Sequence, residues 1–499
     1  MSRKPFLAVP RLLFFGACCY TGKPYLARFP KMDQIRFWRT SVPTLSIDQL
    51  KSAFRGELIQ PGDADYESAR KVYNGMIDKH PQLIAKCVDV ADVIAAVNFG
   101  RENNLLTAIR GGGHNGGGLG TCDGGLVIDV SRMKGIRVNP TEKTVRVEPG
   151  CVWGDVDHAT HAFGMAVPCG FISTTGVPGL TLGGGIGYLT RRYGLTIDNL
   201  LSVDMVLADG SFVTSDSKNN PDLFWAVRGG GGNFGVITSF EFRMQPVDMV
   251  QFGPTFWPLE QSGEVLRAYR EFIKQAPEDV SGFFAFLVVP PAPMFPEHLH
   301  MKKVCAIVWC CTASAEQTDA ATKSMRSVGT PLLDHVGPAP FPVVQSMFDG
   351  LFVTGLQWYW RADNFTDLSE EAIAQHVRHG SEVPTMLSTM HLYPVNGAAQ
   401  RVGKNETAYS FREALFAEVI VGVDPDPANA EKITNWCKEY WDALHPFSAG
   451  GAYLNFMMDE GQERIQASYR DNYQRLAVIK KRYDPNNFFR VNQNIRPAG

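Results

Sequence analysis

The sequence contains no uninterrupted apolar stretch of the roughly 20 residues that a membrane-spanning helix needs. It also lacks an excess of charge of one sign, because 48 lysine and arginine residues face 51 aspartate and glutamate residues, for a net charge of −3. Binding to a nucleic-acid backbone depends on a basic surface, which this balance does not supply. We therefore expect neither a membrane span nor a nucleic-acid partner.

The ten cysteines are scattered along the chain without a C-x-x-C pair. This spacing argues against a zinc site, and the low density of cysteine argues against a small fold stapled by disulfides. Hydrophobic residues make up 44% of the chain and charged residues 20%, which is a globular composition. A globular chain of 499 residues is long enough for about two to four domains.

The N-terminus has features of an export signal, because Arg3 and Lys4 precede an apolar run at 12–20. Against this, Arg11 interrupts the apolar stretch, and Met32 is an alternative start of the folded chain. We expect residues 1–40 to form an extension that is either signal-like or disordered. The expected location is the cytoplasm, with export through a twin-arginine-like start as the alternative.

The chain from residue 81 onward alternates between strand and helix patterns. Period and composition predict a strand, a helix and a second strand at 83–88, 89–104 and 105–109. Three glycine clusters follow, at 111–120, 176–187 and 229–235. Because glycine tolerates positive φ and exposes its backbone N–H, such loops are suited to hold a long anionic ligand.

Two of these clusters match the spacing G-x-G-x-x-G, at 111–116 and 230–235. A dinucleotide fingerprint needs a strand before the glycines and a helix after them. Both clusters instead lead into predicted strands, at 126–130 and 236–242. A Rossmann-type nicotinamide site is therefore not expected, and the sequence G-x-x-x-x-G-K-[ST] does not occur.

The character of the sequence changes after Pro246. Residues 251–450 have fewer glycine clusters, more aromatic residues and strand-like runs, which predicts a second α+β domain. Residues 461–482 have a helical pattern, and a turn and a short extended tail follow them.

Several specific segments occur together in this chain. They are RGGGHN at 110–115, GVPGLTLGGGIG at 176–187, RRYGLTIDN at 191–199, DLFWAVRGGGGNFG at 222–235, YLNF at 453–456 and YDPNNFFR at 483–490. Together they resemble the berberine-bridge-enzyme-like flavin oxidases, whose FAD-binding fold is of the vanillyl-alcohol-oxidase type. The flavin loop is most similar to the hydroxynicotine-oxidase branch of that family.

The resemblance implies an α+β, two-domain FAD-binding fold with an inserted substrate domain built on an antiparallel sheet. Applied to this chain, it predicts an FAD-binding domain at 41–250, a substrate-binding domain at 251–450, and a return to the FAD-binding domain at 451–499. The implied cofactor is FAD, and no metal is expected.

The resemblance also implies the residues that bind FAD. His114 is expected to be bonded through its imidazole to the 8α-methyl carbon of the flavin, a reaction that suits a neutral ring nitrogen. The other expected FAD-binding residues are Arg110, Gly111, Gly112, Gly113, Asn115, Gly118, Ser173, Thr174, Thr175, Gly176, Gly179, Leu182, Gly183, Gly187, Gly235, Val236, Asn492 and Asn494.

Many relatives carry a second bond, from a cysteine to flavin C6. Counting back from Gly176 puts that position at Ile172, whereas Cys169 lies three residues earlier. Three residues of extended chain span about 10 Å, so we expect a single covalent bond, through His114.

In the family's Tyr-x-Asn-Tyr segment, the resemblance implies that Tyr453 and Asn455 are catalytic. Tyr453 is the expected proton acceptor, although a packed core tyrosine is the alternative, and Phe456 removes the last hydroxyl of the motif. His391 is expected to be a core histidine on a strand. The alternating Trp358 and Trp360 either line an aromatic pocket or are buried in the core, and we expect burial.

The predicted function is that of an FAD-dependent oxidase, which transfers hydride from a small alcohol, sugar, amine or natural product to flavin N5 and reduces oxygen to hydrogen peroxide. The alternatives are a flavin dehydrogenase with another acceptor and an idle binding protein that keeps the fold. The sequence leaves the substrate and the oligomeric state open.

Overall fold

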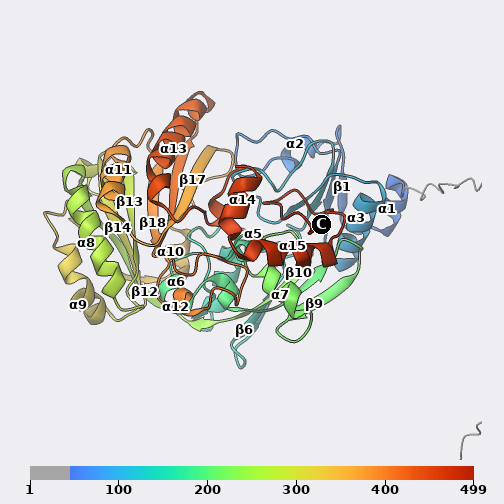
Figure 1. The fold of residues 1–499 in the computed structure, drawn as a ribbon, viewed down its shortest axis with the longest axis horizontal. Coiled ribbons are helices and arrows are strands. Elements are labelled where there is room, and N and C mark those ends of the chain that lie inside the picture. The colour runs from blue at the N-terminus through green and yellow to red at the C-terminus, as the bar shows by residue number, and fades with distance from the viewer. Residues whose placement is uncertain (1–44) are drawn as a thin grey trace, which may run out of the picture. The chain divides into compact units, whose positions relative to one another are not determined.

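Residues 45–499 are described by the computed structural model, and they form two groups of β-sheets, one in each half of the chain (Figure 1). The predicted N-terminal extension, with its signal-like segment, lies outside the described residues. Within residues 45–499, no helix has the length and apolar character needed to cross a bilayer.

The first sheet of the N-terminal half confirms the predicted strand, helix and strand. Its four strands, in spatial order, are β1 (Glu57–Ile59), β2 (Leu83–Lys86), β4 (Leu126–Asp129) and β3 (Thr107–Arg110), of which β2, β4 and β3 are parallel. Helix α3 (Val90–Glu102) begins at Asp89, whose carboxylate accepts a hydrogen bond from the Asp92 N–H. The apolar side of α3 packs on this sheet through Val93 and Val97.

A second sheet carries the rest of the N-terminal half. Its antiparallel strands, in order, are β5 (Ile136–Asn139), β6 (Thr144–Val147), β10 (Val236–Arg243), β8 (Leu200–Val206) and β9 (Phe212–Asp216). Helices α3, α4 (Trp153–His161) and α7 (Pro221–Val227) pack against this sheet, and α5 (Val177–Gly183) lies within the glycine segment at 176–187. The loops at 111–120 and 229–235 lead into β4 and β10 rather than into helices, as the sequence predicted.

The C-terminal half contains one large antiparallel sheet. Its order is β15 (Leu333–Asp334), β12 (Met249–Pro258), β14 (Lys303–Cys311), β13 (Gly282–Val288), β18 (Thr389–Pro394), β19 (Phe416–Asp424) and β17 (Gln357–Phe365), with β16 (Gly337–Pro340) paired to β12. The predicted domain boundaries at 250 and 450 stay predictions, and all strands of this sheet lie between Met249 and Asp424.

The two faces of the large sheet have different partners. Four helices cover the outer face, on the left of Figure 1: α8 (Ser262–Gln275), α9 (Ala315–Arg326), α11 (Glu370–Gly380) and α13 (Ala430–Leu444). Side chains alternate between faces, so Phe284, Leu392 and Ile420 join the core under these helices. Their neighbours Phe283, His391 and Val419 point to the inner face, toward the N-terminal half.

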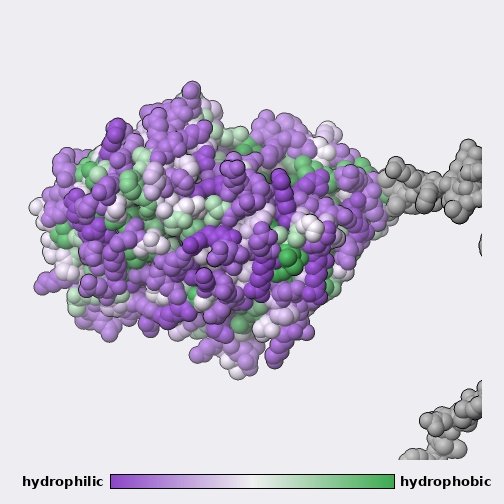
Figure 2. Space-filling model, in the orientation of Figure 1, coloured by the Kyte–Doolittle hydropathy of each residue, from purple (hydrophilic) through white to green (hydrophobic). Residues whose placement is uncertain are grey.

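The outer surface in the view of Figure 2 is mostly hydrophilic, and its apolar residues form small separate groups. Most large aromatic side chains are instead buried, including Trp257, Trp309, Tyr269 and Phe284. The large apolar side chains of this sheet and its helices are therefore buried inside the protein rather than exposed on its surface.

The chain after the large sheet returns to the N-terminal half through two helices, α14 (Gln462–Tyr469) and α15 (Asn472–Tyr483). The sequence predicted one helical segment at 461–482, which is wrong at one point. Arg470 has φ 47°, a left-handed conformation that ends α14 before α15 begins. The break turns α15 so that it packs on α7.

The C-terminal tail docks on the glycine cluster at 229–235. Buried Lys480 donates hydrogen bonds from Nζ to the Asn233 and Phe489 carbonyls, at 2.6 and 2.8 Å, and forms an ion pair with Asp484 at 2.7 Å. The Asn233 amide in turn donates to the Gln493 carbonyl and accepts from the Ile495 N–H. The tail and this glycine loop are therefore one hydrogen-bonded unit.

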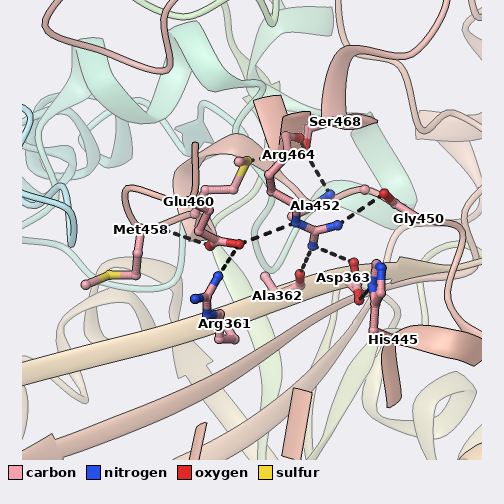
Figure 3. Close-up of polar contacts among 12 residues, drawn as sticks. Arg361, Ala362, Asp363, His445, Gly450, Ala452, Met458, Glu460, Arg464 and Ser468 are labelled. Carbon is pink, nitrogen blue, oxygen red and sulfur yellow. Dashed lines mark hydrogen bonds and ion pairs between the residues drawn. The ribbon is translucent and has the colours of Figure 1, made fainter. Parts of the chain in front are cut away.

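A buried arginine joins the large sheet to the return segment (Figure 3). The Arg464 guanidinium, on α14, lies 2.6 Å from the Asp363 carboxylate of β17 and 3.4 Å from Glu460. It also donates to the carbonyls of Ala362 and Gly450. Glu460 binds Arg361 of β17 at 2.6 Å. The turn at 450–460 is thereby fixed against β17 from both ends.

We predict that Arg464→Met lowers the free energy of unfolding by about 3–5 kcal/mol, because it leaves the fully buried Asp363 carboxylate without its guanidinium. Urea denaturation measures the change. The matched control is Arg482→Met, which removes an exposed arginine paired with Asp222 and is expected to cost less than about 1 kcal/mol. Equal stability of the two variants would contradict the assignment.

Candidate functional site

A cavity of about 860 Å³ lies between the glycine loops of the N-terminal half and the inner face of the large sheet. The return segment supplies a third wall through Tyr453–Phe456, and the tail contributes Val491–Gln493. Four parts of the chain that are far apart in sequence therefore meet at one site.

Most of the residues that the sequence analysis assigned to FAD or to catalysis line this cavity. They are Arg110, Gly111, Gly112, Gly113, His114, Asn115, Thr175, Gly176, Gly179, Leu182, Gly183, Gly235, Asn492, Tyr453 and Asn455. The structure brings them together, and their roles toward FAD stay predictions.

Six of the predicted residues do not line the cavity: Gly118, Ser173, Thr174, Gly187, Val236 and Asn494. The Ser173 hydroxyl turns away to donate to Asp349 at 2.5 Å, and Thr174 is exposed. Gly187 packs on the Cys169 carbonyl, and Val236 is buried in β10. Of these, Ser173, Gly187 and Val236 make their contacts within the protein rather than with the cavity.

The first two glycine clusters meet backbone to backbone. A Cβ atom on Gly112 would lie 2.5 Å from the Gly176 nitrogen, and one on Gly176 would lie 2.4 Å from the Gly112 nitrogen. No side chain fits at either position, so glycine is required for close contact rather than for flexibility. This contact sets the distance between the His114 loop and the wall at 175–176.

His114 lies in this wall and stacks on Tyr73, with ring centroids 4.0 Å apart and planes 16° apart. Burial lowers the pKa of the His114 imidazole to about 4, and a hydrogen bond to the Thr174 backbone opposes the shift. The ring is therefore neutral at pH 7, which is the form that acts as a nucleophile.

Cys169 lies behind the cavity wall. Its side chain is buried, it does not line the cavity, and its Sγ accepts a hydrogen bond from the Gln345 amide at 2.7 Å. Burial raises the pKa of the thiol well above its usual value, which disfavours the reactive thiolate. Ile172, at the position where many relatives have the flavin-bonded cysteine, lies in the cavity wall.

The hydroxyl of Tyr453 is held by three N–H donors. It accepts from the backbone of Gly185 at 2.8 Å, from Ile186 at 3.3 Å and from the Asn455 amide at 2.7 Å. Burial raises the pKa of Tyr453 to about 12, and the three hydrogen bonds oppose the shift. The predicted role as proton acceptor stays a prediction. These contacts favour a positioning role, because the oxygen is already saturated with donors.

Asn455 completes this unit. Its amide also donates to the Leu180 carbonyl at 3.0 Å, and a Cβ atom on Gly183 would lie 2.2 Å from its Oδ1. Asn455 and Tyr453 therefore fix the C-terminal end of α5, where the cavity-lining residues Leu182 and Gly183 lie.

The inner face of the large sheet is aromatic. The expected burial is confirmed for Trp358, which also lines the cavity, whereas the expectation that His391 lies in the core outside the site was wrong. Trp358 and Trp360 both line the cavity, whereas Tyr359 between them points to the outer face and packs near α13. His391 also lines the cavity and forms a hydrogen bond through Nδ1 with the Tyr393 hydroxyl at 2.5 Å.

The sequence contained a signal for the His391 and Tyr393 pair that the analysis missed. The two residues lie two positions apart on a strand, so they share one face. Strand register alone does not tell which face meets the flavin loops, because that depends on how the two halves of the chain pack.

Several polar atoms of the cavity wall are buried and have no partner within residues 45–499. They are Asn492 Oδ1, Tyr188 Oη, Trp358 Nε1 and Trp360 Nε1. Buried polar atoms are normally paired, so these atoms indicate a ligand with both donors and acceptors. A site with bare glycine loops at one end and unpaired polar and aromatic groups at the other fits FAD.

Comparisons with known proteins agree with this geometry. Residues 81–216 match the family model described as FAD binding domain, and residues 452–496 match the one described as berberine and berberine like. An FAD-linked oxidoreductase of Dictyostelium discoideum is 31% identical over 463 residues, which cover 91% of this chain and 97% of the relative.

Two further proteins extend the comparison. The (R)-6-hydroxynicotine oxidase of Paenarthrobacter nicotinovorans is 26% identical over 473 residues, covering 90% of this chain and 98% of that protein. The solved glucooligosaccharide oxidase of Acremonium strictum, whose FAD is 6-S-cysteinyl and 8α-N1-histidyl, superimposes with a TM-score of 0.81 at 22% identity, covering 90% and 98% of the two chains. This chain therefore belongs to the berberine-bridge-enzyme-like family of FAD-linked oxidoreductases.

Proposed function

We propose that this protein is an oxidase that holds FAD through one covalent bond, to His114, and oxidises a small organic substrate with molecular oxygen as the acceptor. The observation that carries the proposal is a neutral, buried imidazole in a glycine-lined wall of a cavity that matches FAD in size and in donor set. Among the similar proteins, the hydroxynicotine and glucooligosaccharide enzymes are named as oxidases.

When bound, FAD supplies a two-electron acceptor at N5 of its ring system. The loop at 110–115 and the wall at 175–176 would hold its phosphate-bearing part through backbone N–H groups. Asn492 Oδ1 and the indole N–H groups of Trp358 and Trp360 are the buried polar atoms available to it or to a substrate.

The protein contributes position and an aromatic environment. Tyr453 and Asn455 hold the end of α5 against the return segment, which keeps the cavity floor fixed. The inner face of the large sheet lines the space above the floor with aromatic side chains. A substrate bound between the two walls reacts without leaving this enclosed space.

The surroundings of Cys169 and Ile172 support a single covalent bond. A thiol that is buried behind the wall and bonded to Gln345 has neither the access nor the thiolate form needed to react. Ile172, which faces the cavity, has a hydrocarbon side chain that cannot react with the flavin.

We predict that His114→Ala makes all of the flavin extractable after acid precipitation, whereas Cys169→Ala leaves the covalent fraction unchanged. The reason is that His114 lines the cavity within the glycine loop, whereas Cys169 does not line the cavity. Mass spectrometry of tryptic peptides measures the result, because His114 lies in the peptide 111–132. Flavin joined to a peptide that contains Cys169 would show that the single-bond assignment is wrong.

We also predict that turnover in air produces one hydrogen peroxide per substrate oxidised, measured with a peroxidase-coupled dye. A substrate that bleaches the flavin without oxygen, followed by slow recovery when air is admitted and fast recovery with a quinone, would identify a dehydrogenase instead. Colourless protein after expression with excess riboflavin would support the idle binding protein.

A further inference from the structure

The substrate side of the cavity carries almost no charge. Among residues 45–499, its lining contains no aspartate, glutamate or lysine. The one arginine, Arg110, is already paired with Asp129 at 2.7 Å, and both side chains are buried. A charged substrate would therefore lose its hydration without gaining a counter-charge.

Polar side-chain groups of the inner face of the large sheet lie on two strands, the indole N–H groups of β17 and the side chains of β18. β12, β13, β14 and β19 present aliphatic or phenyl side chains, such as Phe252, Phe283 and Val419. The polar side chains that β18 directs inward are Thr389, His391 and Tyr393. The Thr389 hydroxyl is satisfied, because it donates to the Phe286 carbonyl at 2.7 Å.

His391 and Tyr393 remain as an unsaturated polar pair. Their only side-chain hydrogen bond within the described part of the chain joins His391 Nδ1 and the Tyr393 hydroxyl at 2.5 Å. The Tyr393 oxygen therefore keeps a free acceptor position, in contrast to the Tyr453 oxygen with its three N–H donors.

Aromatic rings fix the direction of this pair. Tyr393 stacks on Phe171 with centroids 3.9 Å apart and planes 18° apart, and Phe283 lies 5.0 Å from Tyr393 and 4.9 Å from His391. Phe456 of the return segment lies 5.8 Å from Tyr393 on another side. These rings pack against the Tyr393 ring and fix its orientation, and the surface that they present to the cavity suits contact with a planar apolar group.

We propose that Tyr393 and His391 are the proton-accepting pair of the active site and that they act on the hydroxyl group of an uncharged aromatic alcohol. This inference rests on the proposed oxidase function and adds to it the substrate class and the residues that take up the proton. Tyr393 is the catalytic residue, because it touches the substrate, and His391 acts through it.

The step balances in atoms and charge. The substrate O–H proton passes to the Tyr393 oxygen while the phenol's own proton passes to His391 Nδ1, and the carbinol hydrogen leaves with its electron pair as hydride, for which bound FAD would supply the acceptor. The products are a carbonyl compound and an imidazolium. Reduction of oxygen to hydrogen peroxide would then take up the hydride, which is two electrons and one proton, together with the proton held by His391.

Burial keeps both members of the pair neutral and makes His391 a weak base, so the proton has to move in concert with the departure of hydride rather than in a separate ionisation. It lowers the pKa of His391 to about 3, so the imidazole is in its basic form throughout the physiological range. An imidazolium with a lowered pKa also releases its proton readily, which resets the site. Burial raises the pKa of Tyr393, so the phenol alone is a poor base at pH 7.

The pair has few titrating neighbours. The other titratable side chains in the cavity lining are Tyr73, Arg110, His114, Tyr188, His335 and Tyr453. The neighbouring strands face the pair with Phe283 from β13 and Val419 from β19, which do not titrate. The shift of His391 has burial as its cause, without a charged partner.

The first experiment measures flavin reduction in the holoenzyme by anaerobic stopped flow, with benzyl and cinnamyl alcohol as probes. Tyr393→Phe and His391→Asn are each expected to lower the limiting rate about 100-fold or more. Tyr359→Phe, on the opposite face of the same sheet, is the matched control, with an expected change of less than about twofold. Rates in Tyr393→Phe within threefold of wild type would overturn the proposal.

The pH profile separates proton transfer from a structural effect. Wild-type reduction is expected to be flat from about pH 5 to about pH 9, because neutral His391 is present throughout. In His391→Asn the Tyr393 phenol must ionise, so the rate is expected to rise about tenfold per pH unit between about pH 7 and about pH 9. A profile parallel to that of the wild type would contradict the role of His391.

The substrate class is tested with a matched pair, methyl 4-(hydroxymethyl)benzoate and 4-(hydroxymethyl)benzoate, which differ in charge. The uncharged ester is expected to reduce the flavin at least about 10-fold faster at equal concentration. Equal rates, or reduction by cellobiose and by neither aryl alcohol, would overturn this assignment. The covalent flavin on His114 is measured separately, so its loss would instead refute the proposed function.

A binding measurement tests the pair without turnover. The alcohol 2-phenyl-2-propanol has no carbinol hydrogen, and isopropylbenzene lacks the hydroxyl. Calorimetry with wild-type holoenzyme is expected to show about 3- to 10-fold tighter binding of the alcohol, and this preference is expected to disappear in Tyr393→Phe. A preference that persists in Tyr393→Phe and disappears in Tyr453→Phe would transfer the role to Tyr453.

Discussion

The buried guanidinium of Arg464 is the contact on which the geometry of the cavity depends (Figure 3). It binds the Asp363 carboxylate and the Ala362 carbonyl of β17. It also binds the Gly450 carbonyl, at the start of the turn that carries Tyr453. On one side of this contact, β17 presents Trp358 and Trp360 to the cavity. On the other side, the turn presents Asn455 to α5. Because the ion pair is buried, its loss is costly and its geometry is rigid.

This arrangement separates two kinds of wall. The N-terminal half offers bare backbone in glycine loops, which is suited to a phosphate-bearing cofactor. The large sheet offers aromatic side chains and one polar pair, which are suited to an uncharged ring with a hydroxyl group. The return segment, fixed by Arg464, keeps the two walls at a constant separation, so a cofactor and a substrate meet in a defined orientation.

The local patterns of the sequence predicted much of the N-terminal half. The strand, helix and strand at 83–109 follow from period and capping, and the position of His114 follows from its glycine loop. The offset of Cys169 correctly indicated a residue outside the cavity lining. The break in the helix at Arg470 could not be predicted from the sequence, because an arginine in the left-handed conformation has no compositional signal. The orientations of Ser173 and His391 could not be predicted either, because they depend on tertiary packing. Asp349 binds the Ser173 hydroxyl, and the packing of the two halves of the chain puts His391 in the cavity lining.

The account divides the reaction between a flavin fixed on His114 and a proton acceptor on the opposite wall. The most direct test is a crystal structure of the flavin-loaded protein with 2-phenyl-2-propanol bound. The account predicts the phenyl ring in the cavity beside the inner face of the large sheet, with the alcohol oxygen within hydrogen-bond distance of the Tyr393 hydroxyl, about 2.5–3.0 Å. An alcohol oxygen on Tyr453 instead, or a flavin ring whose reactive face is turned away from β18, would contradict it.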